Sequence, residues 1–592
     1  MRVWIGIVLG MMVGMAQGRV VIGWDGEVRG LDPSLCASVD LRVDCGYLDI
    51  SADDCGKRGC CWDPKNMTGM PQCFQQYDGV PIRRAHVIVS NHFDAGYTLS
   101  TKDVTSLYLD IYNPLAGLVG AEMAKNGSQP FSWMTQSFLT SLLLDCVEGY
   151  EYGCVNTSML AAFEQWVSNG SITWHAFPHN ADLAAMTPSL LEFGIRLTHD
   201  LDERFGARNK TVLSQRDVPG FPIASVPLLE SVGIRAMSEG SNQAMMPPNV
   251  PHGFIWREPG TGANVTVFWH SLNYGILPSP STPVGSSTQH RRLHELGGGT
   301  DWVIDYLQVP GFDEVLVYAW RNDNQGPPPS SSDVATSLAE VQSWFPNASV
   351  SVSTFEAFTD ALLASPAMEN MTIVEADIGD TWVFGIASDP IKTAKFRAID
   401  RLRTACIESK HPECNLSPEG KANSSPFYNF SRLLIKCSEH TWGRTFGVLG
   451  DNRTSRWSNG DFYDDVRMGS PGITTLIESW EEQRLWCIDG PLDALGQGSE
   501  LLANITKDFA DQTPSWPNPS AEGYEKVGDV GMVLEGLGAG VDIQFNASTS
   551  ALQMLLDHST GVNWASPDRQ VGQFYYQTQS QEDIQTFIAA YP

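Results

Sequence analysis

Basic side chains are scarce in this sequence. The 592-residue chain has 38 Lys and Arg against 68 Asp and Glu, which gives a formal net charge of −30 at pH 7. An acidic surface repels phosphate backbones, so a general nucleic-acid-binding function is not expected. Charged residues make up only 18% of the chain and hydrophobic residues 42%, a composition unlike that of disordered proteins. At this length, the chain is therefore expected to fold into several globular domains.

Long hydrophobic runs are missing beyond the N-terminus. No later segment is apolar over the roughly 20 residues that a membrane-spanning helix needs. The chain begins with one Arg and a short apolar run that ends at Ala16-Gln17-Gly18, a small-x-small cleavage pattern. We interpret residues 1–18 as a secretory signal peptide, with a membrane anchor as the alternative. Fourteen Asn-x-Ser/Thr sequons agree with a glycoprotein that is secreted or held in the secretory-pathway lumen, without a transmembrane segment once the signal is removed.

Histidine is absent from the segment that is richest in cysteine. Residues 36–73 hold six of the 12 cysteines, two of them adjacent, and no His. A core this small needs covalent cross-links to fold. The lack of His and an oxidising compartment favour disulfides over zinc, although spacing alone leaves the pairing open.

The details of this segment resemble a trefoil (P-type) domain. Arg42-Val43-Asp44-Cys45-Gly46 and Gly59-Cys60-Cys61-Trp62-Asp63 carry the resemblance, which extends over residues 34–76. It implies disulfides that pair Cys36 with Cys61, Cys45 with Cys60, and Cys55 with Cys73. It also implies a glycan-binding cleft with Trp62 as an aromatic wall, and a stapled spacer without a ligand is the alternative.

Short buried strands alternate with amphipathic helices over residues 84–385. The expected strands lie at 85–90, 171–177, 233–237, 265–270, 314–320 and 348–353, and the helices between them include 188–206, 226–233 and 333–345. This alternation predicts an α/β fold with a parallel sheet that closes into a β/α barrel, in which polar chemistry gathers where strands end.

The chain after the expected barrel is first helical and then rich in β patterns. Helical patterns predict a helical domain or bundle over 386–510, and β patterns predict a partial, shortened β-sandwich over 528–592. The even cysteine count favours three further disulfides, which would pair Cys146 with Cys154, Cys406 with Cys414, and Cys437 with Cys487. The last would anchor a helix that bears His440.

Polar side chains accumulate at the ends of the expected strands. His92 and Asp94 follow the first strand, and residues two apart on an extended chain point to the same side. His179-Asn180, Asp217 and Asp323 also follow strands. Their shared position predicts a site, with ordinary loop capping as the alternative for each one alone.

The ordered series resembles glycoside hydrolase family 38, the α-mannosidases, over about residues 84–590. The resemblance implies a zinc ion held by His92, Asp94, Asp217 and His440. It also implies a retaining hydrolase in which Asp217 is the nucleophile and Asp323 the acid/base. Departures from the family pattern include Tyr97 in place of a Trp beneath the sugar, Val-Pro-Gly after Asp217, and Asn322 before Asp323.

Other side chains complete the hypothesis. Expected substrate-binding residues are Tyr97, Trp133, His179, Asn180 and Trp442, with Trp174 and Phe177 as further apolar walls. Rival catalytic carboxylates are Asp200, Asp202 and Glu239. The sequence therefore favours a secreted zinc glycosidase that acts on glycans or glycoproteins. The alternatives are an inactive carbohydrate-binding protein and a zinc polysaccharide deacetylase.

Overall fold

A computed structural model places most of the chain. It describes residues 21–22, 36, 50–58, 60–64, 72–74, 79–125, 130–146, 154–217, 221–241, 248, 250–270, 306–321, 323–378, 388–416, 425–449, 458–512 and, with short gaps, 518–583. The expected signal segment, Cys45 and Asn322 lie outside these residues. The chain divides into two compact units, the first formed by 1–454, 462–508 and 592 and the second by 455–461 and 509–591.

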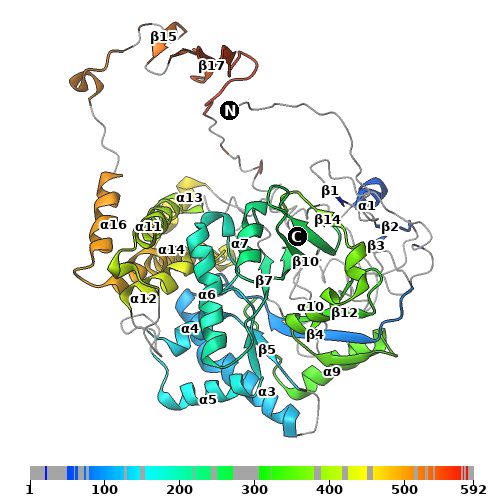
Figure 1. Cartoon of the computed structure of the whole chain (residues 1–592). Helices are drawn as coiled ribbons and strands as arrows, with labels where there is room; N and C mark the ends of the chain where they lie inside the picture. Colours follow the sequence, from blue (N-terminus) through cyan, green and yellow to red (C-terminus); the bar gives the residue numbers. More distant parts are fainter. Residues whose placement is uncertain are drawn as a thin grey trace. The chain divides into compact units, whose positions relative to one another are not determined.

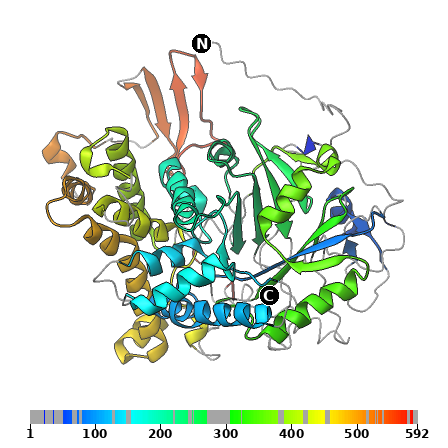
Figure 2. The ribbon, with the colours of Figure 1, turned by 60° about the horizontal axis from the view of Figure 1, so that its bottom comes forward.

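Two six-stranded sheets form the centre of the first unit (Figure 1). One has the order β1 (Val21–Ile22), β14 (Ile373–Val374), β9 (Gly253–Arg257), β10 (Asn264–His270), β8 (Ala236–Ser241), β7 (Val212–Asp217). The other has the order β11 (Tyr306–Gln308), β12 (Glu314–Arg321), β4 (Arg84–Asn91), β5 (Trp133–Thr135), β6 (Ile172–Trp174), with β13 (Ser349–Val352) also pairing with β4. Figure 2 shows β4, in blue, running beside strands from much later in the chain.

The predicted closed barrel is not found. Among the residues that the structure describes, neither sheet closes on itself, and β6 and β7 are outer strands of different sheets. One backbone bond, from Ala176 N to Val212 O at 2.9 Å, joins the chain just after β6 to β7. Two antiparallel pairs, β9 with β10 and β11 with β12, also depart from the all-parallel barrel pattern. The fold class is therefore mixed α/β with largely parallel pairing.

Local sequence explains the principal elements. Residues 85–91 of β4 are all buried, as expected for an apolar strand that has neighbours on both faces of a parallel sheet. Helix α6 (Pro188–Arg204) begins where the Thr187 side chain accepts from Leu190 N and where Pro188 occupies the first turn. The remaining helices of this region are α2 (Thr101–Ser106), α3 (Asn113–Lys125), α4 (Ser137–Leu144), α5 (Thr157–Ser168), α7 (Val226–Ser231), α9 (Ser331–Trp344) and α10 (Phe355–Leu363).

Helices follow the sheets, as the sequence pattern predicts. They are α11 (Pro390–Glu408), α12 (Pro426–Leu434), α13 (Asn459–Met468), α14 (Pro471–Arg484), α15 (Gly490–Leu495) and α16 (Glu500–Asp511). The expectation that a helix bears His440 is wrong, because α12 ends at Leu434 and a 3₁₀ turn ends at Ser438. Among the described residues, no helix combines the length and apolarity that a bilayer crossing demands.

The disulfides follow the predicted pairs with one exception. The structure contains Cys36–Cys61, Cys55–Cys73, Cys146–Cys154 and Cys406–Cys414. Cys60 is also disulfide-bonded, and its expected partner Cys45 lies outside the described residues. Cys437 and Cys487 are instead buried free thiols, and Cys437 Sγ donates to the Cys487 carbonyl at 3.3 Å. The predicted bridge between them is therefore absent from the structure.

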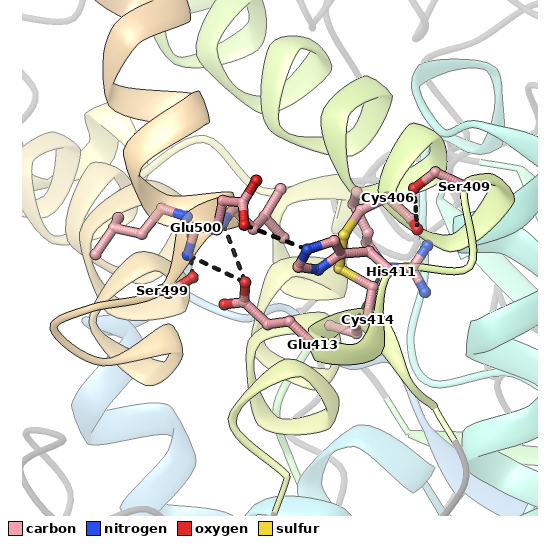
Figure 3. Close-up of a disulfide and its surroundings, with 11 residues drawn as sticks. Cys406, Ser409, His411, Glu413, Cys414, Ser499 and Glu500 are labelled. Carbon is pink, nitrogen blue, oxygen red and sulfur yellow. Dashed lines mark hydrogen bonds and ion pairs between the residues drawn. A yellow bond between two sulfur atoms is a disulfide. The ribbon is translucent and has the colours of Figure 1, made fainter.

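The Cys406–Cys414 bridge ties the last turn of α11 to the 3₁₀ turn at Pro412–Cys414, which lies beside the start of α16 (Figure 3). The bridge closes a turn that carries His411 and Glu413. One Glu413 carboxylate oxygen accepts from Glu500 N at 3.1 Å and Leu501 N at 3.2 Å, two donors at the start of α16 that have no partner within their own helix. His411 Nε2 lies 3.3 Å from the Glu500 carboxylate. The bridge thus holds in place the carboxylate that caps α16.

Removing this bridge is expected to destabilise the first unit. The free energy of unfolding of the Cys406→Ala, Cys414→Ala double variant should be about 2–3 kcal/mol lower than that of the wild type. The bridge joins cysteines 8 residues apart and so restricts the unfolded chain. Thermal unfolding monitored by circular dichroism should show a lower Tm. Ser409→Ala is the control, since it removes only one side-chain bond to the Cys406 carbonyl in the same turn. An unchanged Tm in the double variant would contradict the expectation.

The second unit is a small antiparallel meander. Its strands are β15 (Val533–Leu537), β16 (Val541–Phe545), β17 (Leu552–Asp557) and β18 (Val562–Asn563), hydrogen-bonded in that order. Among the described residues of 571–580, strand pairing is limited to a single bridge between Val571 and Leu552.

The trefoil segment contains α1 (Ala52–Lys57) and the antiparallel pair β2 (Cys61–Trp62) and β3 (Cys73–Phe74).

Candidate metal centre

Four side chains from three separate parts of the sequence converge in the first unit. His92 and Asp94 follow β4, Asp217 is the last residue of β7, and His440 follows the 3₁₀ turn after α12. Their ligand atoms all lie within 4.8 Å of one another. The four residues are only 1–6% exposed. These four residues are those that the family resemblance implies as ligands.

Two backbone contacts bring His440 to the ends of the sheets. The segment after β6 forms an isolated antiparallel bridge between Ala181 and Glu439. Asp182 N donates to Ser438 O at 2.8 Å, and His440 N donates to Asn180 O at 3.2 Å. His440 is therefore held by strand-like pairing with the loop after β6.

Asn324 fixes the loop that carries His92 and Asp94. Its side-chain oxygen accepts from Asp94 N at 3.1 Å, and its side-chain nitrogen donates to Asp94 O at 3.0 Å. Its own backbone N donates to His92 O at 2.9 Å. The backbone of Asn324 has φ 50°, a left-handed conformation that Asn adopts more readily than most residues. Asp323, its neighbour, is thereby placed beside the cluster.

Four of the separations between the ligand atoms lie near the value for a tetrahedral zinc site. His92 Nε2 lies 2.9 Å from Asp94 Oδ1 and 3.8 Å from Asp217 Oδ2. His440 Nε2 lies 3.0 Å and 3.1 Å from the same two oxygens. Zinc bonds of about 2.0–2.1 Å in tetrahedral geometry separate ligand atoms by about 3.3 Å. The donor set of two imidazoles and two carboxylates therefore fits zinc.

The electrostatics of the cluster favour a cation. Burial would lower the pKa of His440, but Glu439, Asp217 and Asp94 outweigh it and raise the pKa well above its ordinary value. His92 follows the same pattern, since burial is outweighed by Asp94 and Asp217 and its pKa is raised. In the metal-free protein, protons thus supply the positive charge that the carboxylates demand. A divalent cation that binds here would displace those protons.

Asp217 occupies an unusual backbone conformation. Its φ is 77°, in the left-handed region that side chains other than those of Asn, Asp and Gly seldom enter. Such strain persists only where the surroundings determine it, and it concentrates at functional sites. The conformation turns the chain at the end of β7, where the carboxylate meets His440 and His92.

Asp323 is a half-buried residue that lies beside the cluster but not within it. Its Oδ1 is buried without a hydrogen-bond partner. Burial, reinforced by the neighbouring Asp94 carboxylate, raises the pKa of Asp323 to about 7. A group with this pKa can hold a proton near neutral pH and then release it.

The other predicted site residues divide into two sets. Tyr97 is 37% exposed, and Trp442 is half-buried with Lys392 Nζ 3.9 Å from its ring centroid. Asn180 Nδ2 lies 3.2 Å from His92 Nδ1. Asn180 therefore contacts a residue of the cluster. Tyr97 lies three residues after Asp94 in the sequence, and Trp442 lies two residues after His440.

Trp133 and His179 instead belong to the core. Trp133 has no exposed surface and stacks on Tyr108. His179 is equally buried and has its Nε2 3.0 Å from Ile435 O. Trp174 and Phe177 are also buried. In this conformation, none of these four side chains is exposed to contact a sugar.

Two of the three rival carboxylates have structural partners. Asp200 accepts from the Tyr428 hydroxyl at 3.1 Å. Asp202 is fully buried and pairs with Lys210 Nζ at 2.8 Å while accepting from the Trp174 indole at 3.0 Å. Glu239 lies buried within β8. The second metal-like group, Cys406, His411 and Cys414, is occupied by its own disulfide.

Two residues that contact the ligands escaped the sequence reasoning. Glu439 lies 2.9 Å from His440 Nδ1, and Asn324 forms two bonds to the backbone of Asp94. Neither carries a sequence signal of its own, because acidic residues and Asn are common in loops. The bonds from Asn324 to Asp94 join segments 230 residues apart, so only the folded chain reveals them.

Comparison with known sequences identifies the cysteine-rich segment. The family model for the trefoil (P-type) domain matches residues 36–76. Dog trefoil factor 3 is 44% identical over 56 residues, which is 9% of this chain and 69% of that protein. Through this segment the chain belongs to the trefoil family. This confirms the trefoil resemblance. Rat trefoil factor 3 is 42% identical over 50 residues, 8% of this chain, so the chain spans about 60% of the length of that relative.

Beyond the trefoil domain, residues 386–592 match a family described as a domain of unknown function, DUF5054. Among solved structures, an α-mannosidase from Enterococcus faecalis V583 is similar, with a TM-score of 0.44, 11% identity, and coverage of 72% of this chain and 43% of that chain. A GH57 branching enzyme from Thermococcus kodakaraensis has a TM-score of 0.38, 10% identity, and coverage of 72% and 94%. Similarity at this level assigns neither a fold family nor an activity.

Proposed function

We propose that this protein is a secreted, zinc-dependent retaining glycoside hydrolase of α-mannosidase type that acts on glycans or glycoproteins. The observation that carries the proposal is the convergence of His92, Asp94, Asp217 and His440 within 4.8 Å, with the half-buried Asp323 beside them. In such a site, zinc would bind sugar hydroxyls and stabilise the distorted ring of the transition state.

Asp217 is suited to the role of nucleophile. Its carboxylate would attack the anomeric carbon and form a covalent glycosyl-enzyme as the bond to the leaving oxygen breaks. A zinc ion held by the four residues would favour its ionised form, and His440 Nε2 lies 3.1 Å from Asp217 Oδ2. Its position at the end of a buried strand also holds it rigidly.

Asp323 is suited to the role of acid and base. With its pKa raised to about 7, it can protonate the leaving oxygen in the first step. The resulting carboxylate would then take a proton from the water that attacks the glycosyl-enzyme. The two displacements together retain the configuration at the anomeric carbon. The trefoil domain would contribute glycan binding.

Metal removal provides the test of the whole proposal. We expect purified full-length protein to release 4-nitrophenol from 4-nitrophenyl α-mannoside, and turnover to fall to background after treatment with a chelator and to return with zinc. A panel of other glycosides would define the sugar. Glycan binding that resists the chelator, without any turnover, would overturn the proposal in favour of an inactive carbohydrate-binding protein. Release of acetate from acetylated polysaccharide without release of sugar would favour a zinc deacetylase.

A further inference from the structure

We propose that Arg216 is a positioning residue that fixes the end of β7, and with it Asp217, against strand β12 of the other sheet. The inference rests on the metal centre of the proposed function and adds a residue to it. β7 ends at Asp217, whereas β12 pairs with β4, the strand that leads into His92 and Asp94. The metal centre therefore joins two sheets, and the placement of one sheet against the other decides whether its ligands meet.

Three hydrogen bonds tie the Arg216 guanidinium to its own sheet. Nη1 donates to Gln215 O at 2.7 Å and to Ser238 O at 2.8 Å, and Nη2 donates to Ser238 Oγ at 2.9 Å. Ser238 lies on the neighbouring strand β8, opposite Ser214 of β7. The guanidinium therefore connects the last residues of β7 to β8.

The same guanidinium lies over two aromatic rings of β12. Its Cζ atom is 4.5 Å from the centroid of the Trp320 ring and 5.2 Å from that of the Tyr318 ring. Residues two apart on a strand point to the same side, so both rings face the sheet that carries Arg216. Ser238 Oγ also lies 3.2 Å from the Tyr318 hydroxyl. All four side chains are buried, and a contact between a cation and a ring is stronger there than at an exposed site.

These contacts immediately precede the metal centre along both strands. Arg216 is the residue before Asp217, and Trp320 precedes Asp323 by three residues. Within the described part of the chain, β7 and β12 belong to different sheets, so side chains rather than a strand ladder set their spacing. Arg is suited to this role, because its planar group stacks on rings and donates several hydrogen bonds at once, whereas the compact ammonium of Lys does not combine the two. Arg216 thus holds the Asp217 carboxylate at the distance that a shared metal ion requires.

Arg216→Lys keeps the charge but loses the planar stack. We expect zinc affinity, measured by competition with a chromophoric chelator in the absence of substrate, to fall about 10-fold, the lower end of what supporting residues contribute to metal affinity. Unchanged zinc affinity would overturn the inference.

Arg403→Lys is the matched control. Arg403 is also completely buried, its Cζ lies 5.1 Å from the centroid of the Phe193 ring, and its Nε donates to Ser431 Oγ at 2.9 Å. It lies on α11, so its replacement should lower Tm and leave zinc affinity unchanged. An equal loss of zinc affinity in both variants would overturn the inference, because any buried Arg would then have the same effect through stability alone.

A double-mutant cycle with Trp320 shows whether Arg216 acts through the other sheet. Trp320→Leu removes the ring and should itself weaken zinc binding, whereas Trp320→Phe keeps an aromatic face and should weaken it less. Arg216→Lys should then reduce zinc affinity less in the Trp320→Leu background than in the wild-type background. Equal losses in both backgrounds would overturn the inference. If Arg216→Lys does not fold, the two Trp320 variants decide, and equal zinc affinity in them would overturn it.

The measurement also separates this inference from the proposed function. Wild-type protein that binds zinc but cleaves no glycoside would refute the glycosidase and leave the role of Arg216 standing. Unchanged zinc affinity in the Arg216→Lys variant would refute only the positioning role. Wild-type protein that binds no zinc would refute both.

Discussion

Replacing Asp217 with Ala is expected to reduce glycoside cleavage by at least about 10⁴-fold, the scale on which loss of a nucleophile acts in other covalent mechanisms. The carboxylate has two functions in the proposed mechanism, since it attacks the anomeric carbon and also faces the shared metal position. Its Oδ2 lies 3.1 Å from His440 Nε2 and 3.8 Å from His92 Nε2. The variant should therefore lose both turnover and zinc affinity, measured by 4-nitrophenol release and by chelator competition.

Asp217→Asn separates the two functions. The amide oxygen can still face a metal, but the amide is a poor nucleophile, so turnover should fall far more than zinc affinity. Asp200→Asn is the control, because Asp200 accepts from Tyr428 and lies in the helix α6 rather than at the cluster. Substantial turnover in either Asp217 variant would reject its assignment as nucleophile.

Sequence patterns predicted the strands that have apolar runs and the helices that have a clear helical periodicity. β4, β10 and β12 follow apolar runs, and α6 and α11 follow helical periodicity with Pro in the first turn. These features are local, so a single segment contains the physical information. The clustering of His92, Asp94, Asp217 and His440 required a family resemblance, because the separations along the chain are too large for periodicity to relate them.

The features that sequence reasoning missed depend on long-range pairing. Closure of a sheet depends on which outer strands meet, and here β6 and β7 remain in different sheets. Trp133 and His179 were predicted to bind substrate but are fully buried, because an aromatic ring at a strand end can turn into the core as readily as into a cleft. Whether a side chain faces solvent is decided by its neighbours in the fold.

Replacing Asp323 with Ala is expected to lower turnover by about 10²- to 10⁴-fold, the range that a general acid/base contributes. The size of the loss should depend on the leaving group. A 4-nitrophenyl glycoside needs little protonation as it departs, whereas a natural glycan with an alcohol leaving group needs a full proton transfer. The ratio of wild-type to variant kcat/KM should therefore be much larger for the glycan, and equal losses on both substrates would contradict a role as acid.

The pH profile supplies an independent check on the same residue. The acid must be protonated to act, so wild-type kcat/KM should fall as the pH rises through the pKa of Asp323, which burial raises to about 7 in the metal-free protein. A bound divalent cation lowers the pKa of a nearby carboxyl group, so in the zinc-loaded protein this alkaline decline should begin at or below that pH. Asp323→Ala should lose the decline, and its persistence would assign the proton to another group.

Rescue by a small anion tests the second half of the mechanism. In the Asp323→Ala variant, no carboxylate remains to take a proton from water, so the glycosyl-enzyme on Asp217 should accumulate. Azide needs no deprotonation and fits the space left by the missing side chain, so it should attack the anomeric carbon and displace Asp217. The product should be a glycosyl azide with the configuration of the substrate. Inverted product would show that Asp217 forms no covalent intermediate and would exclude the retaining mechanism.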